Sequence, residues 1–302
     1  MDSRPSGAGR AKTGIIWALS LVATAAIVFF ASTRLPDGTA GSDGSPSMRR
    51  QLLLSGMRLN LARAGELEKC AVLSERDEES ANFAEESKSA SATVERDLGK
   101  LRKLIGEQGS AKERELLGKF ERSWKQLKQI DAPLLLAAPQ NTNIKAVELS
   151  GTIGAELLQK FHDDLAKAAQ KTTPVSKRIE MEKLAAQAEN AVQGIAILQM
   201  QHIHTLSAPE KAAIEAPMNA AVKHAESRLK SMEAVSGRKS NGLLGNAATV
   251  LGEIVQLNEE IVRLSKIDSN AGSAEVSLGR RRMADTECDR LLKELQSESF
   301  GN

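Results

Sequence analysis

The sequence predicts an all-α protein, in which an N-terminal transmembrane helix is followed by two tandem antiparallel four-helix bundles. Three observations support this fold class. The 302 residues are dominated by helix-forming types, and aromatic residues make up only 3% of them. One long run near the N-terminus carries no charge. Beyond that run, apolar residues recur at alternating spacings of three and four, as on one face of an amphipathic helix.

Composition also excludes several kinds of protein. Lys and Arg number 41 against 39 Asp and Glu, which gives a formal net charge of +2. A nucleic-acid-binding protein needs a basic excess and stacking aromatic residues, so we expect no nucleic-acid partner. Two cysteines are too few for a disulfide framework or a tetrahedral cysteine zinc site.

The uncharged run from Gly14 to Thr33 predicts the transmembrane helix, with the lipid bilayer as partner. Twenty residues at helical rise span a hydrocarbon core of about 30 Å. Arg4, Arg10 and Lys12 precede the run, so the positive-inside rule places residues 1–13 in the cytoplasm. We therefore expect a single-pass protein of the cytoplasmic (inner) membrane with a periplasmic or extracytoplasmic C-terminal domain. The alternative is a cleaved signal peptide, which disagrees with the length of the run.

Residues 34–47 are rich in Gly, Ser, Pro and Asp and predict a linker. Residues 48–171 then predict the first bundle, because they contain four apolar stripes separated by helix-ending residues. Its stripes include Leu53 to Ala71, Phe83 to Ile105, Leu117 to Leu134 and Val147 to Leu165. We expect the second helix to begin at a cap of the form Ser74-x-x-Asp77.

Residues 172–302 predict the second bundle, with four further stripes and a capping box at Ser207-x-x-Glu210. A shift of 127 residues aligns 129–150 with 256–277 and matches Asn143 to Asn270 and Thr142 to Ser269. This match predicts a tandem repeat. The Asn-Thr-Asn turn at 141–143 and the Asp-Ser-Asn turn at 268–270 are both interpreted as helix N-caps.

The basic N-terminus, the anchor helix and the stretch FERSWKQLKQIDAPLLLAA at 120–138 together resemble a known family. They look like the four-helix-bundle sensory domain of methyl-accepting chemotaxis proteins and related bacterial transmembrane sensors. This resemblance implies chemotaxis-type signal transduction and a small organic ligand bound by arginines of the first helix, here Arg58 and Arg63. We expect no output domain of its own, so a separate transmembrane sensor or a homo-oligomer is the implied partner.

The Arg280-Arg281-Arg282 run makes Arg280 and Arg281 two more candidates for binding an acidic ligand. The competing interpretation is a solvated helix face. His202 and Met200 suggest a metal or haem site, but no second ligand motif accompanies them, so we expect no metal and no cofactor. Cys70 and Cys288 either form a disulfide or are two small buried residues.

No nucleophile elbow, phosphate loop or pair of catalytic carboxylates is recognisable, so we expect no catalytic residues and no enzyme. The function predicted from the sequence is a membrane-anchored sensory or ligand-binding helical protein. The alternative is a structural or scaffolding helical protein of the cell envelope. Ligand binding predicts a polar pocket with an arginine between helices, whereas scaffolding predicts cores filled with Ala and Leu.

Overall fold

A computed structural model describes residues 45–236 and 240–301, and within these ranges all regular structure is helical. The helical class predicted from composition and periodicity is therefore confirmed. The predicted cytoplasmic segment 1–13 and transmembrane helix 14–33 lie outside the described residues, as does the linker up to residue 44. None of the helices that the structure describes is both long enough and apolar enough to cross a membrane.

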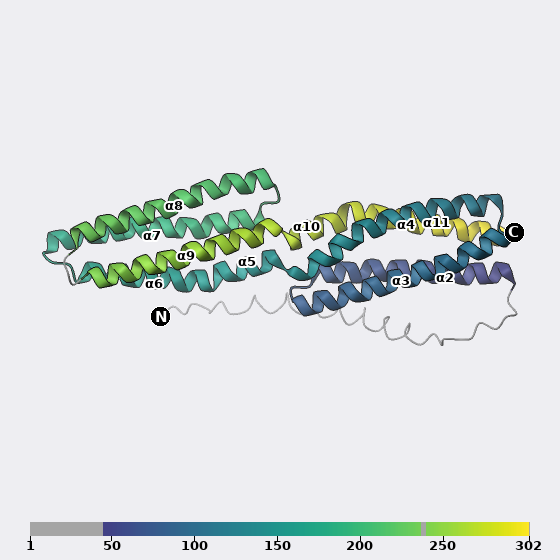
Figure 1. The fold of residues 1–302 in the computed structure, drawn as a ribbon, viewed down its shortest axis with the longest axis horizontal. Coiled ribbons are helices and arrows are strands. Elements are labelled where there is room, and N and C mark those ends of the chain that lie inside the picture. Colours follow the sequence, from purple (N-terminus) through teal and green to yellow (C-terminus); the bar gives the residue numbers. More distant parts are fainter. Residues whose placement is uncertain (1–44, 237–239, 302) are drawn as a thin grey trace, which may run out of the picture. The chain divides into compact units, whose positions relative to one another are not determined.

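Residues from Arg50 onward form one compact unit, to which the following description applies. Its elements in chain order (Figure 1) are α2 (Pro46–Leu73), α3 (Asp77–Gln108), α4 (Ala111–Ala137), the short 3₁₀ turn η1 (Ala138–Gln140), α5 (Thr142–Gly151), α6 (Ile153–Gln170), α7 (Val175–His204), α8 (Ala208–Val235), α9 (Asn241–Ile267), α10 (Ser269–Val276), the π-helical turn η2 (Ser277–Arg281) and α11 (Arg282–Gly301).

The first core is built by α2, α3, α4 and α11, the last helix of the chain. Its buried side chains come from all four helices: Leu54, Met57, Leu61, Val94, Leu98, Leu101, Ile105, Leu116, Leu117, Phe120, Trp124, Leu127, Cys288, Leu291, Leu292 and Leu295. Phe120 and Trp124 stack with ring centroids 6.2 Å apart. The predicted periodicity is confirmed, since these positions follow the stripes read from the sequence.

The second core is built by α6, α7, α8 and α9. Its buried side chains include Phe161, Leu165, Ala188, Met232 and Leu251. The chain enters this core through α4, η1, α5 and α6 and returns to the first core through α9, α10, η2 and α11 (Figure 1).

This packing corrects the predicted grouping of 48–171 and 172–302. Helix α6, expected in the first group, packs against α7 and α9, and α11, expected in the second group, packs against α4. An apolar stripe shows that a helix face is buried, but not which helix covers it. Phe161, which lies on the fourth stripe of the first predicted group, therefore belongs to the second core.

Helix ends also differ from the sequence interpretation. The capping box is formed at Ser110, whose side chain accepts a hydrogen bond from the Glu113 N–H while the Glu113 carboxylate accepts one from the Ser110 N–H. Helix α3 has Arg76 at its N-cap, and Ser207 holds the N-cap of α8 without a side-chain bond. The predicted cap at Ser74 is therefore wrong, whereas Ser207 is the N-cap residue as predicted but the capping box Ser207-x-x-Glu210 is not formed.

The membership of α11 in the first core predicts the effect of Leu292→Ala. Leu292 is fully buried in the cluster that contains Trp124, so its truncation should destabilise the fold by about 2–5 kcal/mol. Urea unfolding followed by Trp124 fluorescence, in a Trp17→Phe background, measures this loss. Lys293→Ala, on the exposed face of the same helix, should change stability by less than about 0.5 kcal/mol. An unchanged Trp124 transition in Leu292→Ala would contradict the packing.

Candidate functional site

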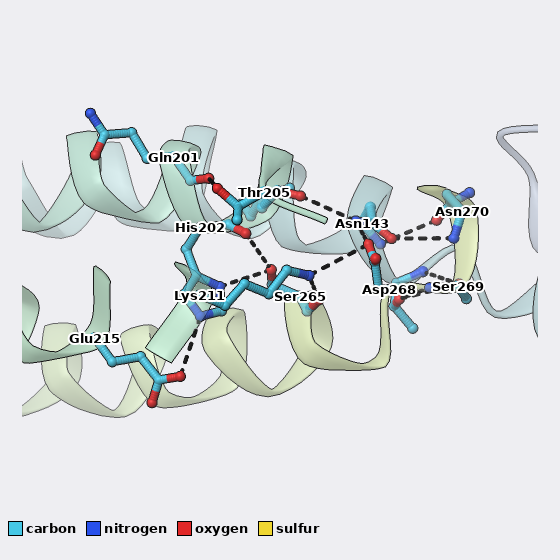
Figure 2. A network of polar contacts seen from close by, with 12 residues as sticks. Asn143, Gln201, His202, Thr205, Lys211, Glu215, Ser265, Asp268, Ser269 and Asn270 are labelled. Carbon is cyan, nitrogen blue, oxygen red and sulfur yellow. Dashed lines mark hydrogen bonds and ion pairs between the residues drawn. The ribbon is translucent and has the colours of Figure 1, made fainter. Parts of the chain in front are cut away.

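The chain passes between the two cores twice, once from α4 through η1 into α5 and once from α9 through α10 and η2 into α11. These two passages meet at a polar joint formed by residues 141–143 and 268–270. The Thr142 N–H donates to Ser269 Oγ at 2.9 Å, and the Ser269 N–H donates to Thr142 Oγ1 at 3.0 Å. The Asn143 N–H donates to Asn270 Oδ1 at 3.1 Å, and the Asn270 N–H donates to Asn143 Oδ1 at 3.2 Å. Each segment therefore caps the N-terminus of the helix that follows the other segment (Figure 2).

The side-chain amides of Asn143 and Asn270 also form reciprocal hydrogen bonds with the opposite segment. Asn143 Nδ2 donates to Asp268 Oδ1 and Asn270 Nδ2 donates to Asn141 Oδ1, both at 2.7 Å. Asn141 and Asp268 are the two non-glycine residues with positive φ among the described residues, at 47° and 55°. Since residues 141–143 match 268–270 at the 127-residue offset, the two segments of the repeat form one reciprocal contact.

A second polar network joins His202, Ser265, Lys211 and Glu215 to this joint (Figure 2). His202 and Ser265 are fully buried, and Lys211 is 4% exposed. Ser265 Oγ donates to the carbonyl of His202 at 3.0 Å, while His202 Nδ1 lies 2.9 Å from the same hydroxyl. Lys211 Nζ donates to the Ser265 carbonyl and lies 3.5 Å from Asp268 Oδ1. The ends of α7 and α9 are thus tied to the start of α8 and to the joint.

The donors and acceptors of this network limit where its protons can lie. The one Ser265 hydroxyl proton can go either to the His202 carbonyl or to His202 Nδ1, so the position of the ring proton decides the direction of the contact between Nδ1 and Oγ. His202 Nε2 lies 3.5 Å from Glu215 Oε1 and donates to that carboxylate when it carries the ring proton. Protons on both ring nitrogens would make this contact an ion pair.

Ser265, His202 and Glu215 share residue types with a hydrolase triad but cannot act as one in this geometry. A triad serine must be free to attack a substrate, whereas the Ser265 hydroxyl lies 3.0 Å from the His202 carbonyl as a donor. The hydroxyl is also fully buried and has no access to a substrate. The triplet is better understood as a structural link.

Burial lowers the pKa of His202, because the charged ring is poorly solvated there, and the neighbouring Glu215 carboxylate only partly opposes this shift. Burial would raise the pKa of Glu215, but hydrogen bonds from Lys266 and His202 outweigh it and lower that pKa. Glu215 is therefore ionised and faces a neutral imidazole at pH 7.

A separate charged cluster surrounds Arg281 in the first core. Arg281 is 2% exposed, and its Nε lies 3.2 Å from Glu68 Oε2 and 3.1 Å from Asp131 Oδ1, while Nη1 lies 3.5 Å from Asp285 Oδ1. Burial raises the pKa of all three carboxyl groups, against the attraction of the guanidinium. A Cβ at Gly65 would lie 3.1 Å from Arg281 Nη1, so the absence of a side chain there leaves room for the guanidinium.

The four predicted ligand-binding arginines are therefore not brought together. Arg281 is neutralised inside the core, whereas its neighbour Arg280 is exposed. Arg58 Nε donates to Asp289 at 3.1 Å, and Arg63 lies 3.6 Å from Glu86. Within the described part of the chain, Arg58, Arg63 and Arg281 already have carboxylate partners, so they do not form an anion pocket. Sequence reasoning missed Lys211, Ser265 and Glu215, because neither spacing nor residue type marks them.

Cys70 and Cys288 are both free, and Cys70 is exposed rather than buried. Burial raises the pKa of Cys288 to about 12, so it remains a thiol. Among the described residues no group of His, Cys, Asp and Glu has a metal-binding arrangement. Met200 packs with Ile203, Ile261 and Leu264 in an apolar cluster beside the joint.

No protein-family model and no curated protein matches this chain.

The reciprocal geometry predicts matched effects for Asn143→Ala and Asn270→Ala. Each variant removes the acceptor of one main-chain N–H and a side-chain amide donor, which in Asn143 also binds the Ile203 carbonyl, so each should destabilise the fold by about 1–3 kcal/mol. The double variant should lose less than the sum, because both residues belong to one set of contacts. Urea unfolding measures all three. Asn246→Ala, on the exposed face of α9, is the control; equal losses in that variant would contradict the assignment.

The lowered pKa of His202 predicts a pH-dependent stability with a definite sign. The unfolded chain takes up this proton near pH 6.5, and the folded chain only at lower pH. Between the two pKa values the unfolded state binds more protons than the folded state. The contribution of neutral His202 to the free energy of unfolding is therefore complete above pH 6.5 and is lost as the pH falls, by at most about 1.4 kcal/mol per pH unit.

His202→Gln should remove that part of the pH dependence. Denaturant unfolding at several values between pH 5 and pH 8 measures it as the difference between variant and parent. His224→Gln changes an exposed histidine of α8 and should retain the parent's slope of unfolding free energy against pH. If the His202 variant keeps that slope as well, the histidine does not titrate as described.

Proposed function

We propose that this chain is a membrane-anchored, extracytoplasmic sensory module, which binds a small ligand and passes the resulting change from one helical core to the other. Residues 14–33 are the proposed membrane anchor, and the fold after the linker is the proposed ligand-binding part. The proposed setting is signal transduction of the chemoreceptor type, with the output supplied by a separate sensor or by a second copy of the chain.

The polar joint is the observation that carries this proposal. Helices α4 and α9 belong to different cores and end just before the joint, from which the chain runs on toward the other core. The contacts between the two passages at residues 141–143 and 268–270 are hydrogen bonds, each with a small net contribution of about 0.5–1.5 kcal/mol. Such contacts can exchange partners at lower cost than an interdigitated apolar core. A shift of a helix in one core can therefore reach the other.

The buried charges favour a responsive module over a scaffold. A scaffold of long helices needs only apolar cores, but Glu68, Arg281, Lys211 and His202 are all less than 5% exposed. Burying ionisable groups requires compensation and rarely adds net stability. Their presence near the joint and in the first core supports a fold in which specificity or response matters more than maximal stability.

A ligand screen tests the proposal on the full chain in lipid nanodiscs. We expect at least one compound among organic acids and amino acids to raise the melting temperature. A ligand at 100 times its dissociation constant stabilises by about 2.7 kcal/mol, which corresponds to roughly 5 °C for a chain of this size. Hydrogen exchange should then show altered protection in both cores.

The double variant Asn143→Ala with Asn270→Ala is the matched test of transmission. In this variant the same compound should still bind, but the change in protection should stay within the core that binds it. Absence of a thermal shift with every compound would instead favour the scaffolding function.

A further inference from the structure

A groove of about 850 Å³ lies between α4 and the passage formed by α10, η2 and α11, directly beside the joint. Its walls are largely apolar, with Ile130, Pro133 and Leu134 on α4 facing Val276, Met283 and Ala284 on the other side. The groove exists because small residues face α4 along α10. A Cβ built on Gly272 would meet no atom within 4 Å, so open space begins at that backbone.

The charges that line this groove leave one cation without a partner. Asp268 is held by Asn143 and Lys211. Glu287 is paired with Arg290 at 2.6 Å, and the Arg290 hydrogen bond lowers the pKa of Glu287. Arg280 lines the groove and has no ion pair with any carboxylate of the described residues. Arg290 also pairs with Glu294, so Arg280 is the charged group of this lining that has no ion-pair partner among the described residues.

This arrangement is selective for one class of molecule. An apolar wall with one free guanidinium complements an amphipathic monoanion, because the carboxylate can accept a bidentate hydrogen bond while the hydrocarbon leaves water. A dicarboxylate would place its second charge against apolar side chains. A cationic amphiphile would be repelled by Arg280.

We propose that this groove binds an aliphatic monocarboxylate, with its carboxylate at Arg280 and its hydrocarbon chain between α4 and α10. The inference rests on the proposed function, for which it names the ligand class and the site. Asp268 and Ser269 belong both to the groove and to the joint, so the occupant lies against the contact that links the two passages. A bound carboxylate would change the distance between α4 and α10 beside the joint.

Calorimetry with octanoate tests the charge, using the full chain in lipid nanodiscs and subtracting the heat of empty nanodiscs. Octanoate should bind, and 1-octanol and octylamine should bind at least tenfold more weakly. Each pair of added methylenes, from hexanoate to decanoate, should tighten binding by about tenfold. Equal affinities for octanoate and 1-octanol would overturn the proposal.

Two pairs of variants test the location. Arg280→Gln should weaken octanoate at least tenfold, whereas Arg282→Gln, two residues away and also exposed, should not. Gly272→Leu should block the groove, whereas Gly252→Leu, another helical glycine with open space around it, should leave binding unchanged. Because Arg280 is exposed, its variant tests the site even if Gly272→Leu fails to fold. Unchanged octanoate binding in Arg280→Gln would overturn the assignment.

The outcomes separate this inference from the function on which it rests. If octanoate does not bind but another compound shifts both cores, the sensory function stands and the groove assignment is wrong. If octanoate binds through Arg280 but protection changes only beside the groove, the ligand site stands and transmission through the joint is wrong.

Discussion

Reciprocal capping at the joint is the constraint on which the arrangement of the two passages depends. The first N–H groups of a helix have no partner within that helix, and here two helices, α5 and α10, begin side by side. Each supplies the oxygens that the other lacks. Because four main-chain donors, two of them in buried and two in part-buried contacts, are satisfied by this exchange, the two passages cannot separate without leaving those donors unpaired.

The sequence predicted the helices and even the residues of the joint, but not their partners. The 127-residue offset aligned Asn143 with Asn270, and the local interpretation of each turn as its own N-cap accounted for both. A side chain that caps its own helix and a side chain that caps a neighbouring helix are of the same residue types, so the sequence pattern is identical for the two. The predicted grouping of α6 and α11 was wrong for a similar reason, because an apolar stripe shows that a helix face is buried but not which helix packs against it.

The arginine run shows the same limit at the level of single side chains. Arg280 and Arg281 are adjacent and chemically identical, but the first lines a groove and the second is buried among three carboxylates. Helix phase separates them, and the π-helical turn at 277–281 changes that phase just before α11. A periodicity of 3.6 residues, applied through the turn, cannot say which arginine faces inward.

The position of the groove beside the joint gives the proposed function a physical route. The cores are close-packed apolar clusters, in which any shift creates voids or overlaps. At the joint, small polar side chains exchange hydrogen bonds, and nearby Lys211 supplies a further donor. A ligand between α4 and α10 would therefore act directly on the hydrogen-bonded contact that links the two passages. The helices that lead away from the joint would then carry that rearrangement into the two cores.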